Sequence, residues 1–551
     1  MPSYSALPEV RQLAALLLAH GVRRCVLCPG SRNSPLVNTL ALMPEMECRG
    51  ATDERSAGFM AIGWILQSRA AVAVVVTSGS AALNLHPAVA EAHYQGLPLL
   101  VISADRPAAW IGQQDGQTLP QQNIFGSLTR FNCSLPEGKD DDWHRVRLIN
   151  EACLALRHHG QGPVHINLPL SEPLFKTSDE ELEEQPLIDR IEFASMGGDE
   201  EEMLINQVKA SPRRMILVGQ HRLAPALSED LQKKGFVIIA EHLGNCAAVA
   251  GAITQADQII GRDCEDIFSP DLLITVGGCI VSKRIKRLLR KNPPRQHWHM
   301  SRDGALVDTF CCLTHCLEGE PDELWDLLSV FADDMDEKPE CEEFYALWHS
   351  SNAQLGAIDC SALPYGAPRL TGELISQLPA PVVLHLANSS AVRYAQLFEL
   401  HPEVEVQCNR GTNGIEGSLS AAIGFAAGDD RLNVLLIGDL SFFYDMNALW
   451  LPALSPNLRI LLLNNGGGGI FSALPGISES PEAAPFVMAK HQHSAQGWAQ
   501  SCGLDYIAVH DLSDWEAAQQ ALLSPEAHAP LLIEAFCDSE QDAQTMLQLI
   551  Q

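Results

Sequence analysis

The sequence predicts an α/β protein made of three doubly wound domains, each built on a parallel sheet. Short β-branched apolar runs alternate with helical patterns along the chain, which is typical of parallel strands joined by crossover helices. Acidic stretches divide the chain into thirds, and the first and last thirds repeat one order of motifs. We therefore expect domains at about 1–180, 190–335 and 345–551, the first and third being related to each other.

Six apolar runs are the clearest predicted strands. Each is four or five residues long, and each is followed by glycine or a polar residue. They are 73–76, 99–102, 215–218, 272–276, 434–437 and 460–463.

The motif order of the first third recurs in the last. A short polar motif follows a strand, a charged turn precedes a glycine-containing helix, and the next strand ends in glycine. From Ser31 to Gly79 is 48 positions, and from Ser389 to Gly438 is 49. An internal duplication explains this agreement, with chance coincidence of small residues as the alternative. Two duplicated open sheets would each offer a crevice at the carboxyl ends of their strands.

Charge and hydropathy exclude several classes of function. The formal net charge is −31, which disfavours nucleic acid and anionic membrane surfaces as partners. No apolar run approaches the roughly 18 residues that a membrane helix needs, so no membrane insertion is expected. The N-terminus MPSYSALPEV lacks the layout of a secretory signal, which favours a cytoplasmic protein.

The sixteen cysteines do not form a disulfide scaffold pattern. Cys25 and Cys28 have redox-motif spacing, but their apolar surroundings indicate a buried strand. A second cluster contains Cys311, Cys312, His315 and Cys316. No other ligand pair follows at zinc-site spacing, so we interpret this cluster as buried thiols rather than a metal site.

The strongest motif combines Gly438-Asp439-Leu440-Ser441 with Asn464-Asn465 and the run Gly466–469. The 26 positions from Asp439 to Asn465 leave room for one crossover helix, expected at 444–454, and a returning strand. Both residues then stand at the carboxyl ends of neighbouring strands. Carboxylate and amide oxygens suit Mg²⁺, which completes its shell with phosphate and water. The glycines allow a carbonyl at Gly467 to become a ligand, so a metal–diphosphate site is predicted. A dinucleotide fingerprint is the nearest alternative, but no GxGxxG opens a helix.

This pattern resembles the signature of thiamine diphosphate-dependent enzymes. The resemblance implies that Mg²⁺ or Mn²⁺ is bound by Asp439, Asn465 and Gly467, and that Glu54 activates the cofactor through its pyrimidine ring. The alternative for Glu54 is a helix N-terminal acid favoured by the helix dipole. The resemblance also implies an active site between a pyrimidine-binding first domain and a diphosphate-binding third domain of another subunit, in a homodimer or homotetramer. Further implied cofactor contacts are Gly438, Leu440, Ser441, Ile415, Ile470 and Phe471.

Several segments are similar to one branch of that family, the synthases of 2-succinyl-5-enolpyruvyl-6-hydroxy-3-cyclohexene-1-carboxylate (SEPHCHC) in menaquinone biosynthesis. The most specific are PGSRNSPL from Pro29, SADRP from Ser103 and NRGTNGIEG from Asn409. This resemblance implies that 2-oxoglutarate is decarboxylated and that its succinyl-semialdehyde carbanion adds to isochorismate. It implies that Arg393 and Arg410 hold the first substrate beside Ser389. Residues implied for isochorismate are Ser31, Arg32, Arg106, Gln117 and Lys283, with help from Arg284.

Some alternatives stay open at this point. Lys283 is a short match and could belong to a solvated basic helix face. An acetolactate-synthase-like or simple 2-oxo-acid decarboxylase activity is the alternative function, although it would prefer a small apolar acceptor over the arginine set. A catalytically inactive paralogue is disfavoured because Glu54, Asp439 and Asn465 are all present. No phosphate-binding glycine loop in the middle third indicates flavin.

Overall fold

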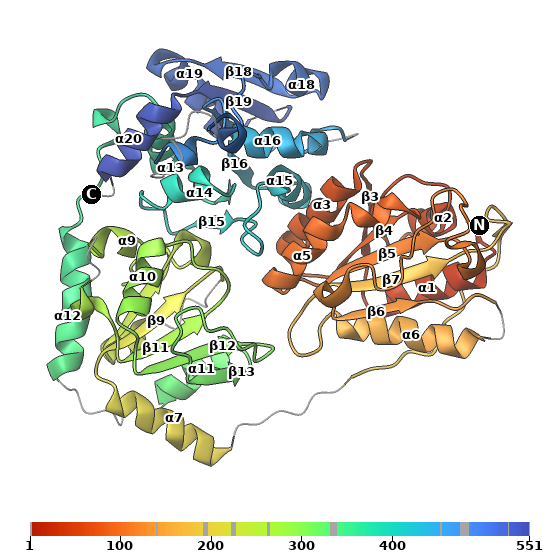
Figure 1. The fold of residues 1–551 in the computed structure, drawn as a ribbon, viewed down its shortest axis with the longest axis horizontal. Helices are drawn as coiled ribbons and strands as arrows, with labels where there is room; N and C mark the ends of the chain where they lie inside the picture. The colour runs from red at the N-terminus through yellow and green to blue at the C-terminus, as the bar shows by residue number, and fades with distance from the viewer. Residues whose placement is uncertain are drawn as a thin grey trace.

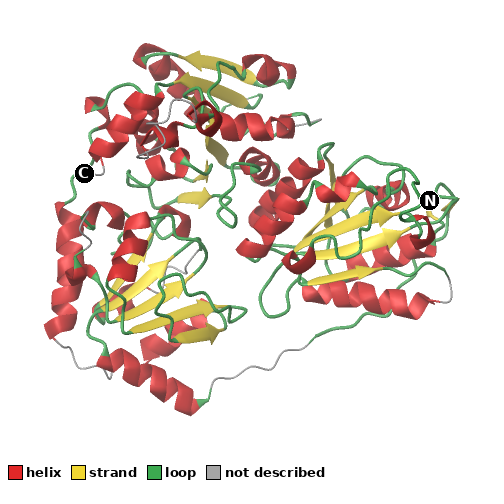
Figure 2. Cartoon of the chain, viewed as in Figure 1, coloured by secondary structure: helices red, strands yellow, loops and turns green. Residues whose placement is uncertain are grey.

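The computed structural model describes residues 3–138, 141–190, 197–221, 228–261, 265–330, 339–451, 454–473, 484–526 and 528–549. The strands of these residues form three parallel sheets and one short antiparallel pair. Figure 1 shows the sheets in three bodies, red to orange, yellow to green and cyan to blue, and Figure 2 shows helices packed around each sheet. The fold is therefore α/β with three doubly wound domains, as predicted.

The first sheet has the strand order β3-β2-β4-β5-β7-β6, with all strands parallel. Apolar side chains on its two faces belong to different cores, because successive residues of a strand point to opposite sides. The strands are β2 (Arg24–Leu27), β3 (Glu47–Gly50), β4 (Val72–Val76), β5 (Leu99–Asp105), β6 (Phe131–Ser134) and β7 (Val164–Pro169). One face carries α1 (Pro8–Ala19), α2 (Ser34–Leu42) and α6 (Asp142–Ala155), and the other carries α3 (Glu54–Ser68), α4 (Ser80–Leu83) and α5 (His86–Gln95). A short pair, β1 (Tyr4–Ser5) and β8 (Thr177–Ser178), ties the N-terminus to the segment after β7.

The second sheet has the order β10-β9-β11-β12-β13 and two separate apolar cores, one on each face. Its strands are β9 (Arg214–Val218), β10 (Phe236–Ala240), β11 (Leu272–Val276), β12 (Gln296–Ser301) and β13 (His315–Glu318). One face is covered by α7 (Gly198–Ala210), α8 (Ser228–Lys233) and α11 (Pro321–Val330), and the other by α9 (Ala256–Ile259), α10 (Lys283–Lys291) and α12 (Pro339–Gln354).

The third sheet repeats the topology of the first. Its order, β15-β14-β16-β17-β19-β18, places the strands in the same sequence of neighbours as in the first sheet, counting along each domain. This agreement confirms that the two domains are related. The strands are β14 (Val382–Leu386), β15 (Val404–Gln407), β16 (Leu432–Gly438), β17 (Leu458–Asn464), β18 (Asp505–Val509) and β19 (Leu531–Phe536). The helices are α13 (Ala367–Ser376), α14 (Ser390–Ala395), α15 (Ser418–Ala426), α16 (Asp439–Asp445), α17 (Ala484–Met488), α18 (Gln496–Ser501), α19 (Leu512–Leu523) and α20 (Ser539–Leu549).

Helices α3 and α15 join the first and third domains within one chain. Residues 56–65 of α3 are all buried, which is typical of a helix enclosed on every side. Glycines permit the close approach: a Cβ added at Gly63 would lie 1.9 Å from the Ala421 carbonyl oxygen, and one added at Gly424 would lie 2.1 Å from that of Met60. The helices containing these glycines were predicted, but their mutual contact was not.

Two sequence predictions are wrong in detail. The crossover helix expected at 444–454 is instead α16, which begins at Asp439, followed by the 3₁₀ turn η9 (Met446–Leu449). An acid is favoured in the first turn of a helix, and Pro452, which itself lies outside the described residues, is disfavoured in a helix interior. The expected buried thiol cluster is also incorrect, because Cys311 and Cys316 are exposed.

The six predicted strands are all present, some extended by one to three residues. Cys25 and Cys28 lie at the buried strand β2 and its end, as predicted. None of the described helices is long and apolar enough to cross a membrane.

Candidate active site

Asp439 and the glycine run meet where β16 and β17 end. The two strands pair in parallel up to Gly438 and Leu463, so the residues that follow them lie at one edge of the sheet. Asp439 is 3 % exposed, and its Oδ2 accepts a hydrogen bond of 2.8 Å from the Gly467 amide. Burial raises the pKa of Asp439, against the lowering effect of that bond. Asp439, at the first position of α16, is thus a buried carboxylate.

An open hollow of ≈ 490 Å³ borders this corner. Gly467 has φ +146°, and an added Cβ would lie 2.6 Å from the Met488 carbonyl oxygen, so only glycine fits there without displacement. The hollow is lined by Asn465, Gly466, Gly467, Gly469, Met488, Lys490, His491, Gln492 and Ser539. A carboxylate, a carboxamide and glycine backbone beside a polar hollow fit a hydrated magnesium diphosphate.

The start of α3 separates the roles of two neighbouring acids. Asp53 is the N-cap, because its Oδ1 accepts hydrogen bonds from the amides of Arg55 at 2.9 Å and Ser56 at 3.2 Å. Glu54 makes no cap bond; its Oε2 accepts a bond of 3.2 Å from the Asn84 side chain. Asp53 therefore fills the cap position, while Glu54 is the first residue of α3, where the helix dipole also favours an acid, so the dipole alternative stays open.

The start of α3 also contacts the far end of α16 and the turn η9 that follows it in the same chain. The Asn447 side chain donates to Asp53 Oδ2 at 2.9 Å, and the Arg55 guanidinium lies 4.5 Å from the Tyr444 ring centroid. Asp439 stands at the opposite end of this seven-residue helix, about 9 Å away at 1.5 Å per residue. Glu54 and the corner formed by Asp439 and Gly467 are thus held by neighbouring elements, without direct contact between them.

Arg393 and Arg410 lie close together on the segments after β14 and β15. Arg410 is 5 % exposed, and its Nη1 donates to Asn388 Oδ1 at 2.9 Å, while its Nε has no hydrogen-bond partner in the described part of the chain. Burial, and then the Arg410 charge, lower the pKa of Arg393. Two guanidinium groups with spare donors form a site for an anion.

Ser389 precedes α14 in a backbone conformation that is rare for serine. Its φ is +72°, and its carbonyl oxygen accepts a hydrogen bond from Arg393 at 2.5 Å. Residues held in such conformations often occur at functional sites. The geometry therefore brings together Ser389, Arg393 and Arg410, the three residues expected at the first substrate.

Arg32 and Arg106 border the carboxyl edge of the first sheet. Arg32 is 5 % exposed and donates to the Leu170 carbonyl at 2.8 Å, just beyond β7. Arg106 follows β5, which pairs with β7, and donates to the Gly116 carbonyl at 3.2 Å. Gln117 is exposed on the same loop with φ +58°, and Ser31 is exposed before α2. These residues share one sheet edge with Glu54.

Lys283 is the first residue of α10 and is exposed. The neighbouring cations are engaged elsewhere: Arg284 donates to the Asp257 carbonyl at 2.8 Å and Lys286 to that of Ile280 at 2.6 Å. The buried Glu241 holds the loop before α10, accepting the Val281 amide at 2.5 Å. Among these three cations, Lys283 is the one whose side chain has no recorded partner in the described residues.

The apolar residues expected around the cofactor have different environments. Ile415 is 36 % exposed, and its carbonyl accepts a bond of 2.5 Å from Ser441 Oγ. Ile470 and Phe471 are half-buried in the turn η10 (Gly469–Ala473) next to the hollow. Leu440 donates its amide to Asp439 Oδ1 at 2.7 Å.

Comparisons with known proteins agree with this arrangement. Residues 10–125 match a family model described as "Thiamine pyrophosphate enzyme, N-terminal TPP binding domain". A SEPHCHC synthase of Phocaeicola vulgatus is 47 % identical, covering 98 % of this chain and 97 % of the relative. SEPHCHC synthases of Bacteroides fragilis and Bacteroides thetaiotaomicron are 47 % and 45 % identical, each with 98 % of both chains covered. This chain belongs to the SEPHCHC synthase family.

Three residues that were not predicted from the sequence contact the loops or side chains of the candidate site. Glu91 on α5 accepts the Gly411 amide at 2.8 Å and the Thr412 amide at 2.7 Å, which orders the loop after Arg410. His491 Nε2 lies 3.2 Å from Asp439 Oδ2. Asn388 donates to the carbonyls of Asn409 and Gly414 at 2.6 and 2.7 Å. Of the three, only Asn388 adjoins a residue named in the sequence analysis, Ser389.

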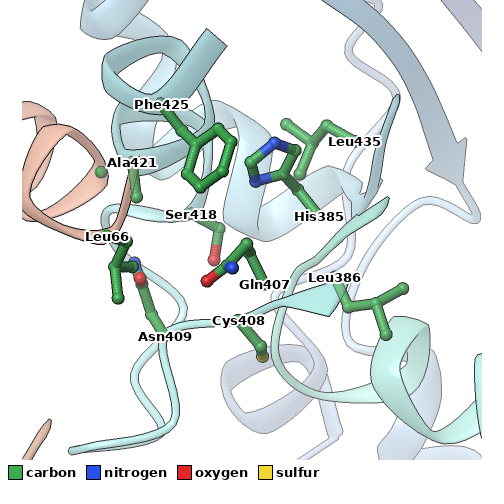
Figure 3. Close-up of a pocket in the computed structure, with 11 residues that line it drawn as sticks. Leu66, His385, Leu386, Gln407, Cys408, Asn409, Ser418, Ala421, Phe425 and Leu435 are labelled. Carbon is green, nitrogen blue, oxygen red and sulfur yellow. The ribbon is translucent and has the colours of Figure 1, made fainter. Parts of the chain in front are cut away.

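A second cavity of this chain lies between α15, β14 and β15 (Figure 3). Figure 3 shows Asn409 and Leu66 on one side, with Phe425 and His385 on the other. Its volume of ≈ 10 Å³ is about that of one water probe, so it cannot hold a substrate.

Proposed function

We propose that this chain catalyses the thiamine diphosphate-dependent synthesis of SEPHCHC from 2-oxoglutarate and isochorismate, with release of CO₂, in menaquinone biosynthesis. The observation that carries the proposal is the pair of the partly buried Arg393 and the buried Arg410 beside Ser389, close to the carboxyl edge of the third sheet. A dicarboxylic 2-oxo acid needs such a cationic site, whereas a simple decarboxylase of small apolar acids does not. Family membership supports the same reaction.

The metal site of this proposal consists of Asp439, the side chain of Asn465 and the carbonyl of Gly467. These groups offer hard oxygen ligands, which favours Mg²⁺ or Mn²⁺. When bound, thiamine diphosphate supplies the carbanion that attacks the 2-oxo acid and takes up the electrons left by CO₂. Gly438, Leu440 and Ser441 line the diphosphate end, and Ile415, Ile470 and Phe471 provide apolar contacts.

Glu54 is proposed to hold a proton on the pyrimidine ring. Its carboxyl group is not used as a helix cap, and its one recorded partner is the Asn84 amide at 3.2 Å. A hydrogen bond from this carboxyl would favour the ring tautomer that acts as the base.

The two substrates are assigned to two sets of cations. Arg393 and Arg410 would bind the distal carboxylate of 2-oxoglutarate, with Ser389 near the reacting carbon. Arg32 and Arg106 would bind the carboxylates of isochorismate, since both border one edge of the first sheet. Ser31, Gln117 and Lys283 complete this second set.

The active unit is proposed to be a homo-oligomer, with the pyrimidine-binding domain (1–180) of one subunit facing the diphosphate-binding domain (345–551) of another. The central domain (190–335) would contribute Lys283. None of the described cysteines forms a disulfide, which suits a reducing cytoplasmic setting.

Single-turnover kinetics on each half-reaction test the proposal. Loss of a charge-assisted contact typically costs about 1.5–3 kcal/mol, roughly 10- to 150-fold in binding. Arg393→Ala should impair CO₂ release from 2-oxoglutarate alone. Arg106→Ala should leave that step nearly normal and raise the KM for isochorismate or slow the second step. If both variants slow CO₂ release from 2-oxoglutarate equally, the assignment of the two substrates to two sets of cations is contradicted. No CO₂ release by the wild type would contradict the function itself.

A further inference from the structure

Three potential metal ligands converge at the edge of the second sheet, in a part of the molecule that the proposed reaction does not use. His297 lies on β12, and Asp308 and Cys312 lie on the segment that leads to β13. One ligand atom of each lies within 4.8 Å of the others. In a tetrahedral zinc site with bonds of about 2.0–2.3 Å, ligand atoms are about 3.3–3.8 Å apart. Small side-chain rotations would therefore bring these three around one ion.

His297 is oriented as a metal ligand requires. It is 1 % exposed, and its Nδ1 has no hydrogen-bond partner among the described residues. Its Nε2 lies 2.9 Å from Thr275 Oγ1, which also has His299 Nδ1 at 3.0 Å and the Trp298 carbonyl at 3.3 Å. In the tautomer in which Nε2–H donates to Thr275, Nδ1 keeps its lone pair for a metal. Metal-binding histidines nearly always have such a second hydrogen bond on the other ring nitrogen.

The protonation of the histidine agrees with this orientation. Burial lowers the pKa of His297 to about 4, so the ring is neutral near pH 7. The Phe310 ring packs edge-on against it with centroids 5.6 Å apart, which restricts its rotation.

Asp308 and Cys312 approach from the more exposed side. Asp308 Oδ1 accepts the backbone amides of Cys312 at 2.8 Å and Leu313 at 3.0 Å, so the carboxylate and the cysteine are held in one turn. Burial and the Asp308 charge raise the pKa of Cys312 to about 11, so the thiol is protonated without a metal. A bound ion would displace that proton. The exposed Asp308 provides an entry path.

We propose that His297, Asp308 and Cys312 form a zinc site in the second domain, separate from the magnesium site at Asp439. The donor set is one imidazole, one carboxylate and one thiolate, with a fourth position for water. Such a set favours Zn²⁺ over Mg²⁺, because thiolate is a soft ligand. The site shares only Cys312 with the sequence cluster that was interpreted as thiols, since His297 and Asp308 join it only through the fold. The ion would tie the turn before β13 to β12.

Cobalt substitution tests this site independently of catalysis. The full-length protein, loaded with thiamine diphosphate and Mg²⁺, is freed of transition metals and titrated with Co²⁺. One equivalent per chain should produce a thiolate-to-cobalt absorption band, and Zn²⁺ should remove it. Cys312→Ser should abolish the band, while Cys316→Ser, which changes an exposed cysteine on β13, should keep it. Asp308→Asn, a change at an exposed residue, should weaken Co²⁺ binding at least about 10-fold without lowering the melting temperature of the metal-free protein.

Three results would overturn the site. They are the absence of a thiolate band in the wild type, a Cys312→Ser protein that keeps the band, and equal loss of the band in Cys316→Ser and Cys312→Ser. Circular dichroism of each variant establishes that the compared proteins are folded. His297→Gln is less suitable as the main variant, because the buried imidazole also bonds to Thr275 and contacts Phe310.

Discussion

At the residue scale, single hydrogen bonds decide what the acidic residues of the candidate site do. Asp53 caps α3 and leaves the adjacent Glu54 available, and Asp439 is buried with both carboxylate oxygens bonded to backbone amides. A metal at Asp439 would compete with the Gly467 amide for Oδ2. The conformation of the glycine run and metal binding are therefore coupled.

Asp439→Asn keeps the size and one acceptor of the side chain but removes its charge. We expect magnesium-dependent binding of thiamine diphosphate to weaken at least about 10-fold, as for the loss of a charge-assisted contact. Calorimetric titration with cofactor and Mg²⁺ measures this change. Asp445→Asn is the matched control, since it removes a buried charge at the other end of α16 that bonds to Ser420. Binding by Asp439→Asn as tight as in the wild type would rule out the metal assignment.

Glu54→Gln should still bind the cofactor but slow proton loss from its thiazolium C2 by about 10²–10⁴-fold, the usual contribution of a general acid–base group. Hydrogen–deuterium exchange followed by NMR measures the rate. Asp53→Asn is the control, because asparagine caps helices about as well as aspartate. If Asp53→Asn slows exchange as much as Glu54→Gln, the effect comes from the helix start rather than from the Glu54 carboxyl.

At the element scale, the α3–α15 contact sets the relation between the first and third domains. Gly63 and Gly424 let two helix backbones touch, and no side chain could replace them without moving one helix. The same contact positions Glu54 at the start of α3. Gly417, before α15, likewise faces Phe59, at 2.2 Å from an added Cβ.

Gly63→Ala should destabilise the protein by about 1–3 kcal/mol, because its Cβ would clash with the Ala421 carbonyl and overpack the contact. Thermal unfolding followed by circular dichroism should show a lower midpoint. Gly50→Ala is the control, since an added Cβ there meets nothing within 4 Å. Comparable loss in both variants would show that the helix contact is not the cause.

At the scale of the whole molecule, one chain contains both halves of the candidate site but holds them at opposite ends of α16. If subunits exchange halves, a chain with a defective first domain can complement a chain with a defective third domain. Glu54→Gln and Asp439→Asn provide these two defects.

The two variants are co-expressed with different tags, and dimers carrying both tags are isolated. Each mixed dimer has one intact site out of two, so we expect about half the wild-type activity. Dimers of either variant alone should be nearly inactive. Inactive mixed dimers would mean that each chain builds its own site, and a failure to form them would contradict the homo-oligomer.

The sequence by itself determined the strand pattern, the relation of the first and third domains, and the cofactor motifs, because these depend on local periodicity and on residues a fixed distance apart. Asp439 and Gly467 were expected at one edge of the third sheet in this way and lie there, while their role as metal ligands with Asn465 stays a prediction. The tertiary structure alone decided which distant residues meet. Glu91 ordering the loop after Arg410, His491 beside Asp439, and His297 beside Cys312 each join segments without a shared pattern. The tertiary structure also decided which side chains are buried. The exposure of Asp439 and of the cysteines near 311 depends on which elements pack over them, and no single segment encodes that packing.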